Sequence, residues 1–306
     1  MDRQSWLKGT LYRPQFEQDS CGFGLIAQMD DKPSHWLVST AINSLACLTH
    51  RGAVAADGKS GDGCGLLFRL PKDFLRAVAV DNGYSLAAQF TAGLVFSALD
   101  KTESAKSIAN LVAAVESQGL VVAGVRDVPV NLDALGAAAM RSLPTIQQIF
   151  VNSPDELSEL EFARKLYQAR RLAEKANTGD ASFYIPTLNP YVMSYKGLVT
   201  PDNLPVFYLD LKDERFASSM AVYHQRFSTN TWPQWKLAQP FRFLAHNGEI
   251  NTLTGNRAWA RAREAIMDSN KLDMDAIRPI VQTNGSDSMS MDNMLESLVL
   301  GGVDVF

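Results

Sequence analysis

Short apolar runs alternate along the chain with segments of helical periodicity, and this alternation constrains the fold more than any other feature of the sequence. We expect strands at residues 23–29, 65–70, 90–99, 120–128, 183–188, 192–199 and 217–226. We expect helices at residues 34–49, 73–82, 103–118, 155–177, 255–269 and 287–300, the first of them with Ser34 as its N-cap. Because the strands are candidates for antiparallel pairing and are mixed with helices, the sequence predicts an α+β fold.

Composition narrows the class of protein further. A chain of 306 residues that is 46% hydrophobic can bury about three quarters of its unfolded surface, as one large domain or two modest ones. Its net charge of -4 is spread without a basic stripe, so we expect no nucleic-acid binding. No apolar run approaches a membrane span of about 18 residues, and the first twenty residues lack the apolar core of a secretory signal. The 3 cysteines follow no framework spacing, which fits a reducing, cytoplasmic setting.

The glycine-rich segment "HRGAVAADGKSGDGCG" at residues 50–65 resembles a phosphate-binding loop only superficially. A P-loop would need a glycine one position later than Gly52, and a helix rather than a strand precedes the segment. We therefore interpret it as a tight backbone turn. Cys47 and His50 have the spacing of half a metal site, but no second pair follows at suitable spacing. We expect no metal site, and we expect both Cys47 and Cys64 to be buried structural residues.

Three polar clusters lie in the C-terminal half: "HQRFSTNTWP" at 224–233, "AHNGEINT" at 245–252 and "NGSDSMSMDN" at 284–293. Each has an ordinary structural explanation when taken alone. Asn247-Gly248 suits a hairpin turn, Arg226 could be a surface charge, and Asp287 could be a helix N-cap. Together with "CGFGLIA", which begins at Cys21 at the border between a charged leader and an apolar strand, they indicate a functional site.

These motifs closely resemble the N-terminal glutaminase domain of the glutamate synthase family, a class II amidotransferase domain of the N-terminal-nucleophile (Ntn) hydrolases. The resemblance runs from Cys21 to Phe306 and includes "HRGAVAADGKSGDGCG", "LPTIQQIFV", "FYLDL", "NGSDSMSMDNMLE" and the unbroken block "HQRFSTNTWPQWKLAQPFRFLAHNGEINTLTGNR" at 224–257. It implies a four-layer αββα sandwich with two stacked, mainly antiparallel sheets. The domain would span residues 21–306, and we expect it to be truncated at its C-terminus because the family's domain continues further.

The resemblance also explains why a cysteine stands at the border after the leader. In this class the nucleophile is the first residue of the mature chain, and its free α-amine is the base that takes the thiol proton. An α-amine has a pKa of roughly 7.7–8.0, whereas an internal amide nitrogen is no base. Cys21 can therefore act only after cleavage of the Ser20–Cys21 bond, and residues 1–20 are expected to be a propeptide.

The other roles follow from matching residues to the family's motifs. Arg226 would bind the α-carboxylate of L-glutamine through two parallel hydrogen bonds, Thr229 would assist through its hydroxyl, and Asp287 would hold the α-ammonium. The Asn247 side chain and the Gly248 backbone N–H would form the oxyanion hole. The implied reaction is hydrolysis of glutamine to glutamate and ammonia.

The resemblance places FMN, an iron–sulfur cluster and the 2-oxoglutarate site in other domains of the parent polypeptide, with no cofactor in this segment. The expected partners are L-glutamine, those synthase domains, and either a small NAD(P)H-oxidising subunit or ferredoxin. The alternatives are another class II amidotransferase, a non-catalytic relic of the fold, or a papain-like hydrolase with His224 or His246 as its base.

Overall fold

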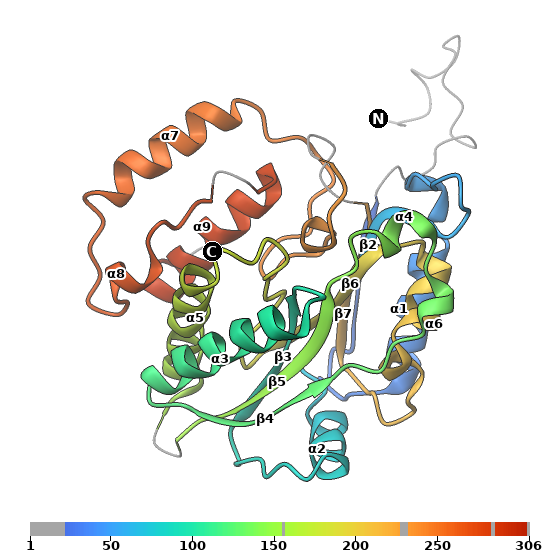
Figure 1. The fold of residues 1–306 in the computed structure, drawn as a ribbon, viewed down its shortest axis with the longest axis horizontal. Helices are drawn as coiled ribbons and strands as arrows, with labels where there is room; N and C mark the ends of the chain where they lie inside the picture. Colours follow the sequence, from blue (N-terminus) through green and yellow to red (C-terminus); the bar gives the residue numbers. More distant parts are fainter. Residues whose placement is uncertain (1–21, 155–156, 227–231, 283–284, 305–306) are drawn as a thin grey trace, which may run out of the picture.

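A computed structural model describes residues 22–154, 157–226, 232–282 and 285–304. In this part of the chain the strands form two antiparallel sheets (Figure 1). The larger sheet has the order β1-β7-β2-β6 and the smaller sheet the order β3-β5-β4. The strands are β1 (Phe23–Ala27), β2 (Ser60–Arg69), β3 (Phe90–Ser97), β4 (Val121–Asp127), β5 (Thr145–Asn152), β6 (Val192–Val199) and β7 (Met220–Gln225).

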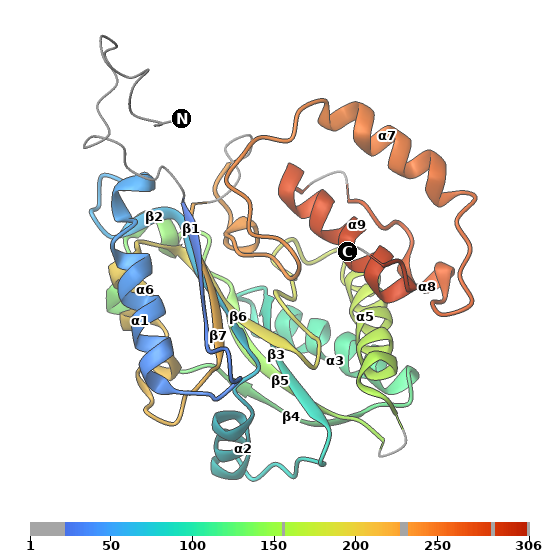
Figure 2. The ribbon, with the colours of Figure 1, turned by 180° about the vertical axis from the view of Figure 1, so that it is seen from behind.

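Helices cover the outer faces of the two sheets and complete four layers (Figures 1 and 2). Helix α1 (His35–Ala46) packs against β1 and β7, whereas α3 (Lys101–Ser117) packs against β3 and β4 and beside α5 (Glu159–Ala176). The predicted α+β class and its two mainly antiparallel sheets are confirmed. The remaining helices are α2 (Lys72–Asp81), α4 (Ala137–Met140), α6 (Leu204–Phe207), α7 (Leu253–Glu264), α8 (Met274–Ile277) and α9 (Asp287–Gly301).

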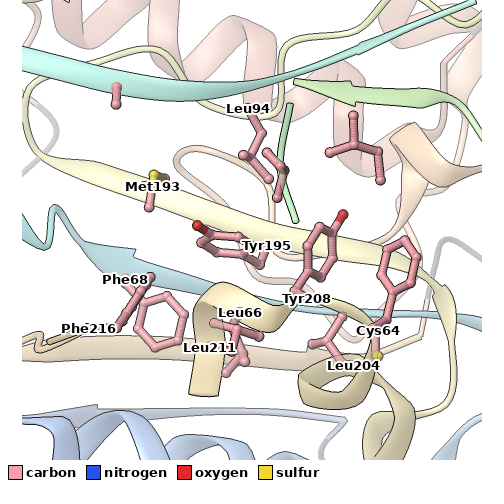
Figure 3. Close-up of a cluster of buried hydrophobic side chains, with 14 of the residues drawn as sticks. Cys64, Leu66, Phe68, Leu94, Met193, Tyr195, Leu204, Tyr208, Leu211 and Phe216 are labelled. Atoms are coloured by element: carbon pink, nitrogen blue, oxygen red, sulfur yellow. The ribbon is translucent and has the colours of Figure 1, made fainter. Parts of the chain in front are cut away.

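The main core joins the two sheets to the helices that cover the larger one. Figure 3 shows part of it, where Phe68 of β2 and Tyr195 of β6 lie on the same side of the smaller sheet's Leu94. The Tyr195 and Tyr208 rings meet edge to face with their centroids 5.0 Å apart, a geometry that aromatic pairs favour. All four of these residues are buried, so the larger sheet packs on a continuous apolar layer.

The predicted start of the first helix is confirmed in detail. Ser34 has extended backbone, and its side chain accepts a hydrogen bond from the Leu37 N–H, which satisfies one of the free donors of the first turn. At the start of α5, Ser158 and Glu161 form a reciprocal capping box. These local signals are why both helices begin close to where the sequence predicts.

The structure corrects three sequence expectations about strands. Residues 183–188 form only an isolated bridge between Tyr184 and Phe96, because Pro186 has no N–H with which to continue a ladder. Strand β5, the centre of the smaller sheet, was not predicted, because two glutamines interrupt its apolar pattern. The predicted turn at 50–65 is strand from Ser60 onward, with an irregular register up to Cys64.

The two described cysteines differ in environment, and one expectation about them was wrong. Cys64 is buried, donates to the Val199 carbonyl oxygen at 3.3 Å, and has its pKa raised by that burial. Cys47 is exposed at the C-terminal end of α1, where its carbonyl lies 3.1 Å from His50 Nδ1. Across the described residues no group of His, Cys, Asp and Glu could hold a metal ion. Of the helices that the structure describes, none has the length and apolar character to cross a membrane.

Candidate active site

The start of β1 and the end of β7 bring two distant segments of the chain together. In the antiparallel pair Phe23 lies opposite His224, and the Gln225 N–H donates to the Gly22 carbonyl oxygen at 2.7 Å. Arg226, the predicted carboxylate-binding residue, follows directly on β7. The structure therefore brings Arg226 close to Gly22, the residue bonded to the predicted nucleophile. Cys21, Ser20 and Thr229 themselves lie outside the described residues.

Asn247 lies against the backbone of Gly22. A Cβ atom added to Gly22 would stand 2.7 Å from Asn247 Oδ1 and 3.1 Å from the Gln225 carbonyl oxygen. No side chain fits there without moving one of them, so glycine at position 22 allows the Asn247 amide to approach the strand. The predicted oxyanion-hole residue thus contacts the residue that follows the predicted nucleophile. Asn247 and Gly248 are both exposed and belong to an irregular segment, so the alternative of a hairpin turn between strands is wrong.

Two buried side chains fix the backbone just before Asn247. His224 Nε2 lies 2.9 Å from the His246 carbonyl oxygen, which Gln239 Nε2 also contacts at 2.9 Å. Gln239 Oε1 accepts from the His246 N–H in return. Because a carbonyl oxygen can only accept, His224 Nε2 carries the proton in this contact. Burial lowers the pKa of His224 to about 4, so the ring is neutral at neutral pH.

Arg226 is anchored by two consecutive residues of β2. Its backbone has φ 125°, a conformation that side-chain-bearing residues rarely adopt, and its N–H donates to the Gly63 carbonyl oxygen at 2.8 Å. Its Nε lies 3.7 Å from Asp62 Oδ2. The Asp62 side chain is only 7% exposed, while that of Arg226 is 43% exposed. Burial raises the pKa of Asp62, and the Ala53 backbone N–H and the Arg226 charge oppose that shift.

Asp287 is the first residue of α9, and it connects this helix to the segment that carries Asn247. The N-cap of α9 is Ser286, whose hydroxyl accepts from the Met289 N–H, so the capping explanation for Asp287 is wrong. Asp287 Oδ2 accepts from the Ile250 N–H at 3.2 Å, and Oδ1 from the Ser288 N–H at 2.6 Å. The carboxylate is buried at a helix N-terminus, where the helix dipole favours negative charge.

A cavity of about 810 Å³ lies between α7 and α9, and Asp287 is one of its lining residues. The rest of the wall is largely apolar and includes Leu253, Trp259, Met291 and Met294. Asp287 therefore supplies a carboxylate at the margin of a cavity, on the side where Ile250 joins the Asn247 segment. Arg257 and Arg263 line the same cavity, and Arg257 lies close enough to Asp287 to interact with its charge.

A buried ion-pair network forms a second connection between α9 and the segment that carries Asn247, here through Arg242 and Phe243. Arg242 lies 3.1 Å from Asp292 and 2.9 Å from Glu296, and Arg170 of α5 also pairs with Glu296 at 2.5 Å. The Phe243 N–H donates to Asp292 at 2.7 Å. Since all these charged groups are buried, each depends on the others for its stability.

We expect Glu296→Ala to lower the free energy of unfolding by about 3–5 kcal/mol, because it leaves Arg170 and Arg242 buried without a shared partner. Urea denaturation monitored by circular dichroism measures the change. Asp275→Ala is the matched control: its pair with Arg278 is exposed and should be worth about 0–1 kcal/mol. Equal losses of unfolding free energy in the two variants would show that the buried network stabilises the fold no more than an exposed ion pair does.

Sequence reasoning missed His224, Gln239 and Asp62 as parts of this site. The first had been considered only as a papain-like base, and its bonded Nε2 and lowered pKa argue for a structural role instead. Asp62 belongs to the glycine-rich segment at residues 50–65, so its carboxylate could be noticed in the sequence. Its partner Arg226 could not be predicted, because the two residues meet only through the pairing of β2 with β7. His224 and Asp62 act through contacts between distant segments of the chain, whereas Gln239 holds a residue only seven positions away.

Comparison with known proteins assigns this arrangement to a family. The family model for glutamine amidotransferases class-II matches residues 21–306. The chain belongs to the class II glutamine amidotransferase family.

Its relatives include several glutamate synthases. The chain is 42% identical over 296 residues to the glutamate synthase [NADPH] large chain of Bacillus subtilis. This alignment covers 95% of this chain and 20% of the relative. It is 42% identical over 297 residues to ferredoxin-dependent glutamate synthase 2 of Synechocystis sp., covering 94% of this chain and 19% of the relative. It is 38% identical over 309 residues to glutamate synthase [NADH] of Saccharomyces cerevisiae, and this alignment covers 96% of this chain and 14% of the relative. The chain thus spans about a fifth or less of the length of these relatives.

Proposed function

We propose that this chain hydrolyses L-glutamine to L-glutamate and ammonia, with Cys21 as the nucleophile. The observation that carries the proposal is the contact between Gly22 and Asn247, with Arg226 adjoining the residue that is hydrogen-bonded to Gly22. A nucleophile, an amide donor and a guanidinium are the groups that attack on a carboxamide of an amino acid requires. Membership of the class II glutamine amidotransferases supports the same reaction.

In the proposed mechanism the α-amine of Cys21 takes the thiol proton, and the sulfur attacks the side-chain amide carbon of glutamine. The amide oxygen becomes an oxyanion that accepts hydrogen bonds from Asn247 Nδ2 and the Gly248 N–H. The α-ammonium then gives its proton to the leaving nitrogen and the C–N bond breaks. Ammonia departs, and the glutamyl group remains bound to Cys21 as a thioester. Water adds to the thioester with the amine again as base, and glutamate leaves with restoration of the thiol.

Substrate recognition is assigned to the two charged residues and one hydroxyl. Arg226 would bind the α-carboxylate, Asp287 the α-ammonium, and Thr229 would assist. Arg226 supports this with a half-exposed guanidinium, and Asp287 with a carboxylate at the margin of a cavity. The clamp would fix the amino-acid end of glutamine while its amide extends toward Cys21.

The domain assignment follows from this chemistry and remains part of the proposal. Residues 1–20 would be a propeptide, and cleavage of the Ser20–Cys21 bond would release the α-amine. The start of the family match at residue 21 supports that boundary. The catalytic domain would include residues 21–306, the range of the family match, and would be one part of a longer protein, since the relatives that the chain matches are about five times longer.

We further propose that the ammonia serves glutamate synthesis from 2-oxoglutarate in a longer, cytoplasmic polypeptide. FMN and an iron–sulfur cluster would belong to its other domains, as the similarity to the glutamate synthases implies. The electron donor would be a small NAD(P)H-oxidising subunit or ferredoxin. The relatives are named for NADPH, ferredoxin and NADH, and the first two are equally similar to this chain, so identity does not choose between these donors.

Labelling with an electrophilic glutamine analogue that carries a diazo-ketone tests the nucleophile. We expect the analogue to alkylate Cys21 in a chain that begins at this residue, and excess L-glutamine to protect it. Cys47 is the internal control, because it is exposed and open to any unselective reagent, whereas Cys64 is buried. Peptide mapping by mass spectrometry that found the label mainly on Cys47 would refute the assignment.

A further inference from the structure

Asp62 is a buried carboxylate beside the guanidinium to which the proposed function assigns substrate binding, and no role has yet been given to it. We propose that Asp62 is a positioning residue: it orients the Arg226 guanidinium and thereby sets how strongly the site selects substrates that carry an α-carboxylate. The inference rests on the proposed function for its consequence in catalysis, but the orientation of Arg226 can be measured separately.

The backbone of Arg226 is the first element of this arrangement. A φ of 125° is sparsely populated for residues other than glycine, so this conformation persists only where neighbouring contacts impose it. The contact that does so is the hydrogen bond from the Arg226 N–H to the Gly63 carbonyl oxygen. Gly63 itself has φ 121°, which glycine adopts without strain. The backbone conformation of Arg226 therefore fixes the position from which its side chain extends, beside Asp62.

The side chains form the second element. Asp62 Oδ2 lies 3.7 Å from Arg226 Nε, and among the described residues neither Asp62 Oδ1 nor Arg226 Nε has a hydrogen-bond partner. Burial of a carboxylate is costly, and the Ala53 backbone N–H and then the Arg226 guanidinium offset part of that cost at Asp62. The approach is to the Nε side, so the two Nη nitrogens at the far end can engage a carboxylate through parallel bonds.

Tight packing fixes where the Asp62 carboxylate lies. A Cβ atom added to Gly52 would stand 2.8 Å from Asp62 Oδ1 and 1.9 Å from Gln225 Nε2. The Asp62 N–H also donates to the Ala53 carbonyl oxygen at 3.2 Å. The carboxylate is therefore enclosed by the segment around Gly52 and by Gln225, and it offers Arg226 a charge at one defined position. An exposed aspartate on a flexible loop could not orient a guanidinium in this way.

The experiment compares two substrates in Asp62→Asn, which removes the charge and keeps the shape. L-glutamine carries the α-carboxylate, and 4-aminobutanamide is the same molecule without it. In the chain that begins at Cys21 we expect the kcat/KM ratio of glutamine to 4-aminobutanamide to fall by roughly tenfold or more, since loss of a charge-assisted contact typically has an effect of this size. The loss should appear as a raised KM for glutamine, with kcat nearly unchanged and 4-aminobutanamide unaffected.

Asp210→Asn is the matched control. Asp210 is also buried and paired with an arginine, but its partners are Arg126 and Tyr195 rather than Arg226. A general loss of stability would lower the active fraction equally for both substrates and leave their ratio unchanged in either variant. Asp62→Glu retains the charge and displaces it by one methylene, so it should give an intermediate ratio if orientation is what matters.

A second readout does not depend on catalysis. The ¹H–¹⁵N resonance of Arg226 Nε, assigned by its absence in Arg226→Lys, should be dispersed in the parent chain and move to the position of free arginine in Asp62→Asn. An unchanged substrate ratio together with an unchanged resonance would overturn the inference. If the parent chain hydrolyses neither substrate, the proposed function fails, and the resonance alone then decides whether Asp62 orients Arg226.

Discussion

A chain that begins at Cys21 is expected to release ammonia from L-glutamine, whereas the chain that retains residues 1–20 is expected to release it on the order of 10²–10⁴-fold more slowly. The reason is local chemistry at one nitrogen. Before cleavage that nitrogen is an amide and cannot take the thiol proton, and after cleavage it is an amine with a pKa near neutral pH. Ammonia release per mole of protein, together with the intact mass of each chain, measures the difference.

The sharpest control for this experiment is a chain that begins at position 20 with Ser20→Ala. It has a free amine but displaces it by one residue from the thiol, and it lacks the bulk of the leader. We expect it to resemble the uncleaved chain. Full activity in an uncleaved, mass-verified chain would contradict the N-terminal-nucleophile mechanism and would leave His246 as the better candidate base, because His224 is already bonded to a carbonyl.

Asn247→Ala should lower kcat for glutamine by about 10²–10³-fold, since removal of one oxyanion-hole donor typically has this effect. KM should change little, because the bond to Asn247 Nδ2 forms fully only when negative charge develops on the amide oxygen. Steady-state kinetics of the chain that begins at Cys21 measures both parameters.

Asn251→Ala is a suitable control, since it removes the same side chain from an exposed position in the same segment. We expect its kinetics to match those of the parent chain. A raised KM with an unchanged kcat in Asn247→Ala would instead mean that Asn247 binds the ground state of the substrate, and the oxyanion assignment would be wrong.

Local signals in the sequence predicted the elements that depend on local interactions. The Ser34 cap fixed the start of α1, and the apolar run at 192–199 corresponds to β6 without an error at either end. Strand β5 was missed because Gln148, which looks solvent-facing, is fully buried and accepts from Arg126 Nε at 2.7 Å. Its environment exists only after β4 and β5 have paired, so no local pattern could report it.

The candidate site divides in the same way. Arg226, Asn247, Gly248 and Asp287 could be proposed from motifs, because their residue types suit the chemistry. The residues that hold them could not, since the bond from His224 to the His246 carbonyl and the approach of Asp62 to Arg226 join segments more than twenty residues apart. Recognition of a motif therefore identifies the groups that react, whereas their orientation depends on the fold.

The hydrogen bond between Gln225 and Gly22 has a consequence for the timing of an entropic cost. The ends of most chains fray, and ordering one residue of backbone costs roughly 1–2 kcal/mol. Here strand pairing continues from β1 to Gly22, which is one peptide bond from the proposed nucleophile. Cleavage would therefore create a new terminus whose second residue is already immobilised by an interior strand. The entropic cost of ordering this residue would therefore arise once, when the sheet folds, and would not recur in each catalytic cycle.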